Sequence, residues 1–572
     1  MASYGERAVE FSQQMSDAEA LMWNIEKDPW LASTMGTVAI TDRPLDVERF
    51  RAKLAAAVAA IPRLRARVMP QLGRLTAPTW EPDAEFDLGY HLLHVAVPAP
   101  GDDAALFDLA ARLLEEPFDR TRPLWRFFVL DGLADGRGAL VVKLHHSLTD
   151  GLGAVRLAEQ YMDLGRDVPA PPPVDLEAVL AADLAARAAG PEPEPAPPTT
   201  ATEAGAPDGT GPAPDADRGP VGLLGTLLGG TADAARRPAG LLRRLAADAM
   251  LAAADPARVP EWGEEAWATV RNTLSQLDPN GPGAQSPLWG RRSRRRVLRS
   301  LSVDLERTRA AAKALGVSIN DLFVAGAALA AAAVHRDAGL TLDQVTITFV
   351  VSTRHDAETA GNAFTPAKVT IPTGTDEAGT GTELAPFARL VSDALAAGRE
   401  QVSAGGGLLA TLSGLINLLP TSLVTRLARA QAQAVDFATS NLRAAPFPVF
   451  IAGAQVLATY PVGPVAGTAF NLTMMSYVDR AYLGVHIDPA AVAEPDALVR
   501  ALDAAYARLL AAAPPEPPPP GPEVTPRPAR AKRARKAPEP DASKPAARRR
   551  GPDRRPPATP RPRANRRSAG GA

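Results

Sequence analysis

Apolar residues recur at helical or strand spacing in the first part of the chain. From Asp46 to Val68 they stand three or four positions apart behind an aspartate that can cap a helix start, which predicts a helix. The run GALVVKLHH, Gly138 to His146, is mostly apolar and predicts a strand. The amphipathic stretch from Leu152 to Gly165 predicts the helix that follows this strand.

A similar pattern returns after residue 290. Ser318 to Arg336 predicts a helix capped by Ser or Asn at its start, and its alanine-rich face predicts close packing. Asp343 to Arg354 is rich in β-branched residues and predicts a strand. Helices mixed with strands in both halves predict an α/β protein with two domains of similar size, at 1–165 and 291–513.

Between and after these domains the apolar pattern breaks. The 166–290 segment includes a stretch of Pro, Ala, Gly and acidic residues, Pro169 to Pro220, whose composition predicts a disordered linker. Amphipathic helical character returns in 221–254, where arginines stand beside leucines. These helices either pack on a domain surface or contact a membrane interface. The Pro-rich 514–572 tail is predicted to be disordered.

Charge separates the tail from the rest of the chain. The 572 residues have a net charge of −2, but the tail carries sixteen Lys or Arg and five Asp or Glu, a net of +11. Such a tail is either a solubilising extension or a contact with anionic lipid, polyphosphate or, less expected, nucleic acid. The arginine-rich run Arg291 to Arg296 is interpreted in one of two ways. It is either a solvated linker or a site that attracts the phosphates of coenzyme A or a lipid surface.

Composition narrows the class of protein further. With 46% hydrophobic and 22% charged residues, the chain is typical of globular proteins. It has no cysteine, which excludes disulfides, thiolate metal sites and a cysteinyl intermediate. The N-terminus has no signal-peptide pattern, which favours a cytoplasmic location. The uncharged run Gln401 to Thr425 is broken by three glycines and Pro420, so we do not expect an integral membrane protein.

Two of the seven histidines are adjacent, at the end of the first predicted strand. Strand side chains alternate between two faces, which puts His146 and His145 on opposite faces. The face of His146 is the more apolar one, and it also carries Leu140, Val142 and Leu144. Apolar surroundings disfavour a charged imidazole, so His146 is a candidate general base, with a core role as the alternative. Adjacent strand residues point apart, so we expect no shared metal.

The spacing His145-His146-x-x-x-Asp150-Gly151 matches the HHxxxDG motif of the acyltransferase superfamily that contains chloramphenicol acetyltransferase and nonribosomal-peptide condensation domains. Further segments resemble, in order, one branch of it, the bacterial wax ester synthase/diacylglycerol acyltransferase family. These segments are RPLWRFFVLDGL, SINDLFVAGAALAA, VVSTRHDAETAGN and TSNLRAAPFP. Val350 stands where this family usually has proline, and SNLRAAPFP replaces a commoner Ser-Asn-Val-Pro-Gly-Pro run. Both departures lie away from the histidine pair, so we expect them to affect acceptor choice or activity level more than reaction class.

The resemblance implies a fold of two chloramphenicol acetyltransferase-like domains that form a pseudo-dimeric sandwich around a central channel. It assigns His146 as general base, with His145 beside it. It assigns Asp150 a scaffolding role through an ion pair with Arg65, and Gly151 a tight turn close to the substrate. Seven further residues are expected either to bind substrate or to have structural roles in turns, helix caps and the domain junction: Pro123, Leu124, Trp125, Asn320, Asp321, Ser352 and Arg354.

The resemblance also implies a reaction. We expect an acyl-CoA-dependent O-acyltransferase that esterifies diacylglycerol, a long-chain alcohol or both, with acyl-CoA as co-substrate and no cofactor or metal. Such an enzyme would lie at the inner face of a membrane or on a lipid droplet. The chain has no G-x-S-x-G elbow, which argues against a serine esterase. Two alternatives stay open: a condensation-type enzyme acting on carrier-bound substrates, and a non-catalytic protein that binds lipid droplets.

Overall fold

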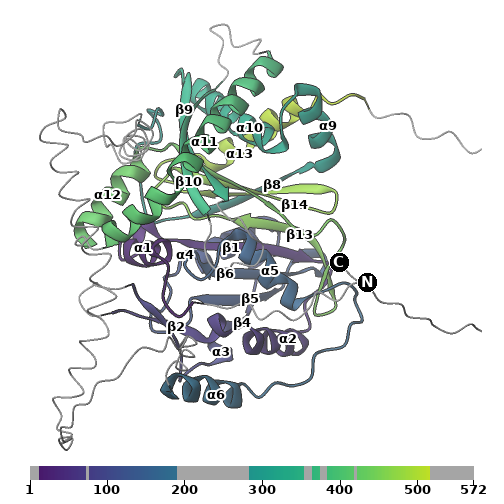
Figure 1. The fold of residues 1–572 in the computed structure, drawn as a ribbon. Coiled ribbons are helices and arrows are strands. Elements are labelled where there is room, and N and C mark those ends of the chain that lie inside the picture. The colour runs from purple at the N-terminus through teal and green to yellow at the C-terminus, as the bar shows by residue number, and fades with distance from the viewer. Residues whose placement is uncertain are drawn as a thin grey trace, which may run out of the picture. The chain divides into compact units, whose positions relative to one another are not determined.

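The computed structural model places two β-sheets and their covering helices (Figure 1). It describes residues 12–71, 77–189, 283–352, 364–373, 383–417 and 421–515. The predicted helices at 221–254, the tail from 516 onward and Arg354 lie outside the described residues, so the predictions made for them stay predictions.

The first sheet takes strands from both halves of the chain. In spatial order its strands are β4 (Leu92–Ala96), β5 (Trp125–Asp131), β6 (Gly138–His145), β1 (Thr34–Thr41), β13 (Ala454–Val462), β12 (Phe450–Ile451) and β7 (Met162–Asp163). β1 pairs antiparallel with β6 on one side and with β13 on the other. This sheet therefore crosses the boundary expected between the 1–165 and 291–513 domains.

The second sheet comes from the C-terminal half alone. Its order is β10 (Phe364–Pro372), β9 (Gln344–Ser352), β11 (Phe437–Arg443), β14 (Phe470–Tyr477), β15 (Arg480–Ile487) and β8 (Val297–Asp304). β11 is parallel to both of its neighbours, whereas the other pairs are antiparallel. A short ribbon of β2 (Ala66–Met69) and β3 (Thr79–Pro82) stands apart.

Helices cover both sheets. The N-terminal half has α1 (Asp17–Ile25), η1 (Pro29–Leu31), α2 (Val47–Ala60), η2 (Pro62–Arg65), α3 (Leu88–His91), α4 (Asp103–Glu115), η4 (Ala134–Gly136), α5 (Gly151–Tyr161) and α6 (Leu176–Ala189). The C-terminal half has α9 (Leu305–Leu315), α10 (Ile319–Asp337), α11 (Leu384–Asn417), α12 (Thr421–Gln433) and α13 (Pro495–Leu510). α1 contacts α11 and α12, so helices also join the two halves.

The helix and strand predictions are confirmed, with shifts at their ends that have local causes. α2 starts after Asp46, whose side chain accepts a hydrogen bond from the Arg49 N–H at 3.0 Å. It ends at Ala60 and not at Val68, because Pro62 cannot continue a helix and starts a 3₁₀ turn instead. α10 starts after Ser318, which forms a reciprocal capping box with Asp321.

The predicted disorder of Pro169 to Pro220 is wrong for part of that segment. Leu176–Ala189 forms α6, which packs on α2 and β3. Asp175 caps α6 by accepting the Ala178 N–H at 3.0 Å. Leu180, a residue of the helix itself, is buried. The sequence signal for this helix is a capping aspartate followed by leucines four residues apart. The high proline content of the surrounding segment obscured it.

The arginine-rich run at 291–296 is only partly solvated. The Arg292 guanidinium donates to the carbonyl of Gly467 at 2.6 Å, and that of Arg296 donates to the Ser293 carbonyl at 2.9 Å. Arg296 is also 3.7 Å from the buried carboxylate of Asp488. Two of the five arginines therefore anchor the start of the second sheet, and the other three are exposed.

α11 continues through the three glycines at 405–407 that were expected to interrupt it. Judged by length and hydropathy, none of the helices in the described part of the chain could cross a membrane alone. α9 and α10 pass that test only when taken together, and they are bent by 91° relative to each other.

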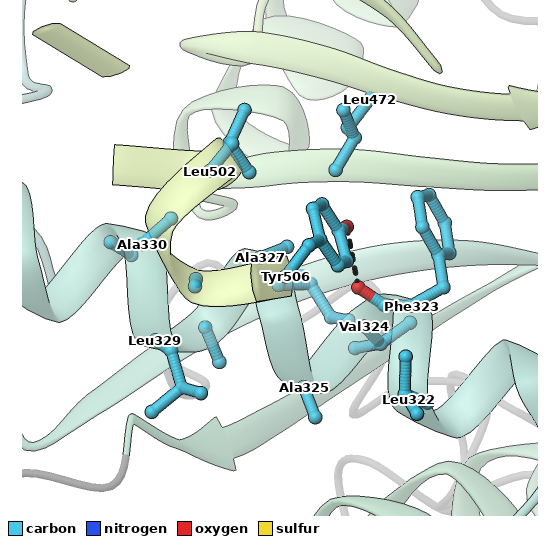
Figure 2. Packing of buried hydrophobic residues seen from close by; sticks show 14 of the residues in the cluster. Leu322, Phe323, Val324, Ala325, Ala327, Leu329, Ala330, Leu472, Leu502 and Tyr506 are labelled. Atoms are coloured by element: carbon cyan, nitrogen blue, oxygen red, sulfur yellow. Dashed lines mark hydrogen bonds between the residues drawn. The ribbon is translucent and has the colours of Figure 1, made fainter. Parts of the chain in front are cut away.

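Close packing of α10 against α13 builds the core of the second sheet (Figure 2). The hydroxyl of Tyr506 on α13 donates to the Phe323 carbonyl at 2.8 Å, and the two rings are nearly parallel. Gly326 lies directly under the Tyr506 ring, where an added Cβ would be 2.7 Å from Cδ1 and would overlap the ring edge. The glycine within this alanine-rich face is therefore what allows the tyrosine ring to pack on α10.

Replacement of Gly326 tests this contact. Gly326→Ala should lower the free energy of unfolding by about 1–3 kcal/mol, because the ring of a fully buried tyrosine has to move. Urea denaturation of the variant beside the parent measures the effect. Gly290→Ala is the matched control, since an added Cβ there meets nothing within 4 Å. Equal stability of the Gly326 variant and the parent would contradict the assigned packing.

Candidate active site

The HHxxxDG segment joins the end of β6 to the start of α5 and is held by its backbone. The His145 N–H donates to the Leu124 carbonyl at 3.0 Å, and the His146 N–H donates to the Ser33 carbonyl at 2.9 Å. β6 therefore stays pinned between its two neighbouring strands up to its last residue. This fixes where both histidine side chains project.

The two histidines project to opposite sides of the sheet. His146 is half-buried and lines a large cavity together with Leu140, Val142 and Leu144. His145 is 1% exposed and lies between the rings of Trp23 and Phe118. The alternation predicted from the strand pattern is thus what the structure shows, and His146 alone of the pair faces the cavity.

His145 is a neutral, hydrogen-bonded core residue. Its Nδ1 accepts the backbone N–H of Ser147 at 3.0 Å and lies 2.7 Å from the Ser147 hydroxyl. Nε2 therefore carries the ring proton, which it donates to the Glu26 carboxylate. Burial, reinforced by Arg120, lowers the pKa of His145 to about 3. Its contacts support a role in holding the loop.

Glu26 was not singled out in the sequence, because it lies 119 residues before its partner and has no motif around it. It sits just after α1, where burial raises its pKa to about 7. Arg120 and the backbone of Ser33 oppose that rise. Ser33 also accepts the His146 N–H, so Glu26 belongs to the same bonded layer beneath the two histidines.

The prediction that Asp150 forms an ion pair with Arg65 is wrong. Arg65 is 4% exposed, and its guanidinium instead contacts Asp183 of α6, with Nη2 3.1 Å from Oδ1. Its Nη1 donates to the carbonyls of Val58 and Ala59, at 2.6 and 3.0 Å. The cause is local: η2 places Arg65 at the carbonyl end of α2, where a cation is favoured.

Asp150 is nevertheless a scaffold residue, through a helix cap. It is 5% exposed, and its Oδ1 accepts the Gly153 N–H at 2.8 Å at the start of α5. The same residue lines the cavity. An Asp side chain is a favoured N-cap because its oxygen accepts an N–H that the helix leaves unpaired, so this bond fixes the Asp150 side chain at the start of α5.

Gly151 packs closely against a side chain of the second sheet. A Cβ on Gly151 would lie 2.7 Å from Cδ2 of Leu442, which comes from β11. Its φ is not in the left-handed region, so its backbone conformation is open to residues other than glycine. Leu442 therefore brings the second sheet against the histidine loop.

The Pro-Leu-Trp segment supports the strands and does not line the cavity. Leu124 and Trp125 are fully buried, and Pro123 is buried beside them. The Trp125 indole N–H donates to the Leu64 carbonyl at 2.6 Å, and the ring stacks on His91 with centroids 4.2 Å apart. Of the two roles expected for these residues, the structure supports packing.

The Asn-Asp segment lies beside the second-sheet wall of the cavity. Asn320 accepts a hydrogen bond from the side chain of Asn441, at 3.4 Å, and Asn441 lines the cavity next to Ser440. Asp321 caps α10 and accepts the Ser392 hydroxyl at 2.9 Å. Ser352 is the last residue of β9 and pairs with Phe364. These contacts are structural, whereas Ser440 and Asn441 form part of the second-sheet wall of the cavity.

The cavity between the two sheets has a volume of about 1500 Å³. Its first-sheet wall includes Met35, Ala39 and Val456, and its second-sheet wall includes Phe349 and Met475. Most of its lining is aliphatic, which suits alkyl chains. His146 is the imidazole on this wall, so it can accept a proton from a hydroxyl bound inside.

The buried Glu26 gives a pH dependence with a definite sign. Its folded pKa is above the ordinary value of 4.5, so its ionisation destabilises the folded protein as the pH rises through about 7. Glu26→Gln removes this loss. Between pH 5 and pH 8, the free energy of unfolding of the variant relative to the parent should rise by up to about 3 kcal/mol. Urea denaturation at both values measures this, and a pH-independent difference would contradict it.

Comparisons with known proteins identify the two halves. Residues 15–323 match the wax ester synthase/diacylglycerol acyltransferase catalytic domain, and residues 360–509 match the C-terminal domain of the same family. A Mycobacterium tuberculosis protein named "Putative diacyglycerol O-acyltransferase" is 27% identical over 523 residues, 90% of this chain and 94% of its own length. Another of that name and species is 29% identical over 465 residues, 79% and 86% of the two lengths.

The fold is also that of a solved structure. A wax ester synthase/diacylglycerol acyltransferase from Marinobacter aquaeolei VT8 superposes with a TM-score of 0.53 at 18% identity, over 87% of this chain and 99% of that one. The expected α/β condensation-type fold is therefore confirmed. Because the catalytic-domain match alone spans more than half of the sequence, the chain belongs to the wax ester synthase/diacylglycerol acyltransferase family.

Proposed function

We propose that this protein is an acyl-CoA-dependent O-acyltransferase that esterifies diacylglycerol, a long-chain alcohol or both, with His146 as the general base. The observation that carries the proposal is the position of His146 on the wall of a large apolar cavity between the two sheets. The family and the names of the relatives agree with acyl transfer to a lipid alcohol.

The chemistry needs one base and no covalent enzyme intermediate. His146 takes the proton of the acceptor hydroxyl while its oxygen attacks the thioester carbonyl carbon. The carbon–sulfur bond then breaks, and the protonated imidazole returns the proton to the departing thiolate. The ester and free coenzyme A leave, and the histidine is again neutral. A single histidine therefore serves as base and then as acid.

The layer beneath the sheet keeps the base in place. Ser33 binds the His146 backbone, and the adjacent His145 is locked between Ser147 and Glu26. The reacting groups must be aligned to within a fraction of an ångström for efficient transfer. In this proposal His145, Asp150 and Glu26 are positioning residues, and of these four residues His146 is the one that contacts the reacting hydroxyl.

The cavity suits substrates that partition into lipid. Its volume of about 1500 Å³ exceeds the 300–1,000 Å³ typical of small-molecule pockets, as two long alkyl chains require. We infer that such substrates are collected at the surface of a membrane or a lipid droplet, with the protein bound peripherally.

Removal of the proposed base tests the mechanism. His146→Ala should lower the rate of labelled ester formation from palmitoyl-CoA with either diolein or hexadecanol by about 10²–10⁴-fold, as expected for a lost general base. The measurement is the initial rate with the purified full-length protein.

His94→Ala is the matched control for this experiment. His94 is exposed on the edge strand β4 and contacts Asp131 at 2.8 Å, away from the cavity. The control should keep the parent rate. Equal rates for the His146 variant and the parent would reject His146 as the base. A parent that esterifies neither acceptor would reject the proposed function.

A further inference from the structure

A buried polar pair interrupts the apolar wall of the cavity on β14. Asn471 and Thr473 are 5% and 2% exposed, and both line the cavity. They rest on Gly463, where an added Cβ would be 2.6 Å from the Thr473 hydroxyl oxygen. Gly463 follows the last residue of β13, so the pair marks the place where the second sheet contacts the first.

Hydrogen bonds fix the orientation of the Asn471 amide. The Thr473 hydroxyl donates to Asn471 Oδ1 at 2.6 Å, and Asn471 Nδ2 donates to the Pro464 carbonyl at 3.0 Å. A carbonyl can only accept, so Nδ2 must be the atom that faces Pro464. An amide nitrogen carries two N–H groups, and this bond uses one of them. Among the described residues no hydrogen bond uses the second, and Asn471 lines the cavity, so we assign this N–H as a donor to a bound ligand.

Strand register gives the distance between this pair and His146. On β1, Gly36 stands opposite Lys143 of β6 and Val462 of β13, so Gly463 lies two strands away from the end of β6. With strands about 4.8 Å apart and a two-residue step along the sheet, the Cα atoms of His146 and Gly463 are separated by about 12 Å. The side chains of His146 and Asn471 both line the cavity, and an added Cβ on Gly463 would be 2.4 Å from Asn471 Oδ1, so imidazole and amide are separated by on the order of 10 Å.

We propose that Asn471 donates a hydrogen bond to an ester carbonyl of the acceptor and so favours glycerolipids that carry an ester beside the reacting hydroxyl. This inference rests on the proposed function. The imidazole and the amide each form a hydrogen bond of about 3 Å to the substrate. A separation of on the order of 10 Å between them then leaves roughly 4 Å between the acceptor hydroxyl oxygen and the second oxygen. Adjacent positions of a glycerol unit provide this separation. A simple long-chain alcohol has no second oxygen to offer.

The test compares two acceptors that differ only in their carbonyl groups. 1,2-Dioleoylglycerol has ester carbonyls, and the corresponding 1,2-dioleyl diether of glycerol has the same hydroxyl and chain length without them. For the parent, kcat/KM should be about 3- to 10-fold higher with the ester, the size expected for one hydrogen bond. Asn471→Leu should bring the two values together, mainly by lowering the value for the ester.

Two further variants separate recognition from folding. Thr473→Val keeps the amide but removes the hydroxyl that orients it, so the ester preference should fall in the same direction by a smaller factor. Gln431→Leu removes an amide from the α12 wall of the same cavity and should keep the parent's ratio.

Three outcomes would overturn the inference. They are a parent that uses ester and diether equally, an Asn471 variant that loses both activities in proportion, and a parent that esterifies only simple alcohols. Each of these leaves acyl transfer by His146 intact. A parent without product from any acceptor contradicts the proposed function itself, so the two failures are distinguishable.

Discussion

The antiparallel pairing of β1 with both β6 and β13 is the constraint on which the site depends. It joins strands from the two halves of the chain into one sheet, with β1 as the strand between them. The register on one side places His146 opposite Ser33, and the register on the other side places Gly463 under the polar pair of β14. The distances across the cavity follow from these two ladders.

The two histidines of the HHxxxDG motif have different surroundings. One face of β6 presents His146 to an apolar space, while the opposite face carries a polar layer of His145, Glu26 and Lys143. Burial pushes the pKa of all three away from their ordinary values; His145 accepts the Ser147 N–H, and Lys143 donates to the Leu113 carbonyl at 2.9 Å. The cost of burying these groups is offset only while the layer stays intact. If this layer were disrupted, the His146 imidazole could move, and the alignment that acyl transfer requires would be lost.

Local patterns in the sequence were enough to predict the elements that carry the motif. Strand alternation separated the two histidines correctly, and capping residues located the starts of α2 and α10. Contacts between distant segments were not readable in this way. Arg65 pairs with Asp183 because a helix hidden in a Pro-rich stretch packs on α2, and nothing near Arg65 indicates it.

Glu26 and Leu442 escaped prediction for the same reason. Glu26 meets His145 across 119 residues, and Leu442 meets Gly151 only because two sheets close on each other. The packing of Leu442 on Gly151 was also not predicted, because a glycine looks the same in sequence whether it serves a turn or a close approach. Residue types alone do not distinguish these cases.

The pairing of β1 with β13 also determines when this protein can be completed during synthesis. Thr37 pairs with Pro461, so β1 leaves the ribosome more than 400 residues before its second neighbour exists. Until then the N–H and C=O groups along one side of β1 have no partner strand. They can therefore pair with an exposed strand of another molecule. Contacts this distant in sequence form slowly. The nascent chain thus carries an aggregation-prone edge for most of its translation, and separating the two halves would leave that edge open permanently.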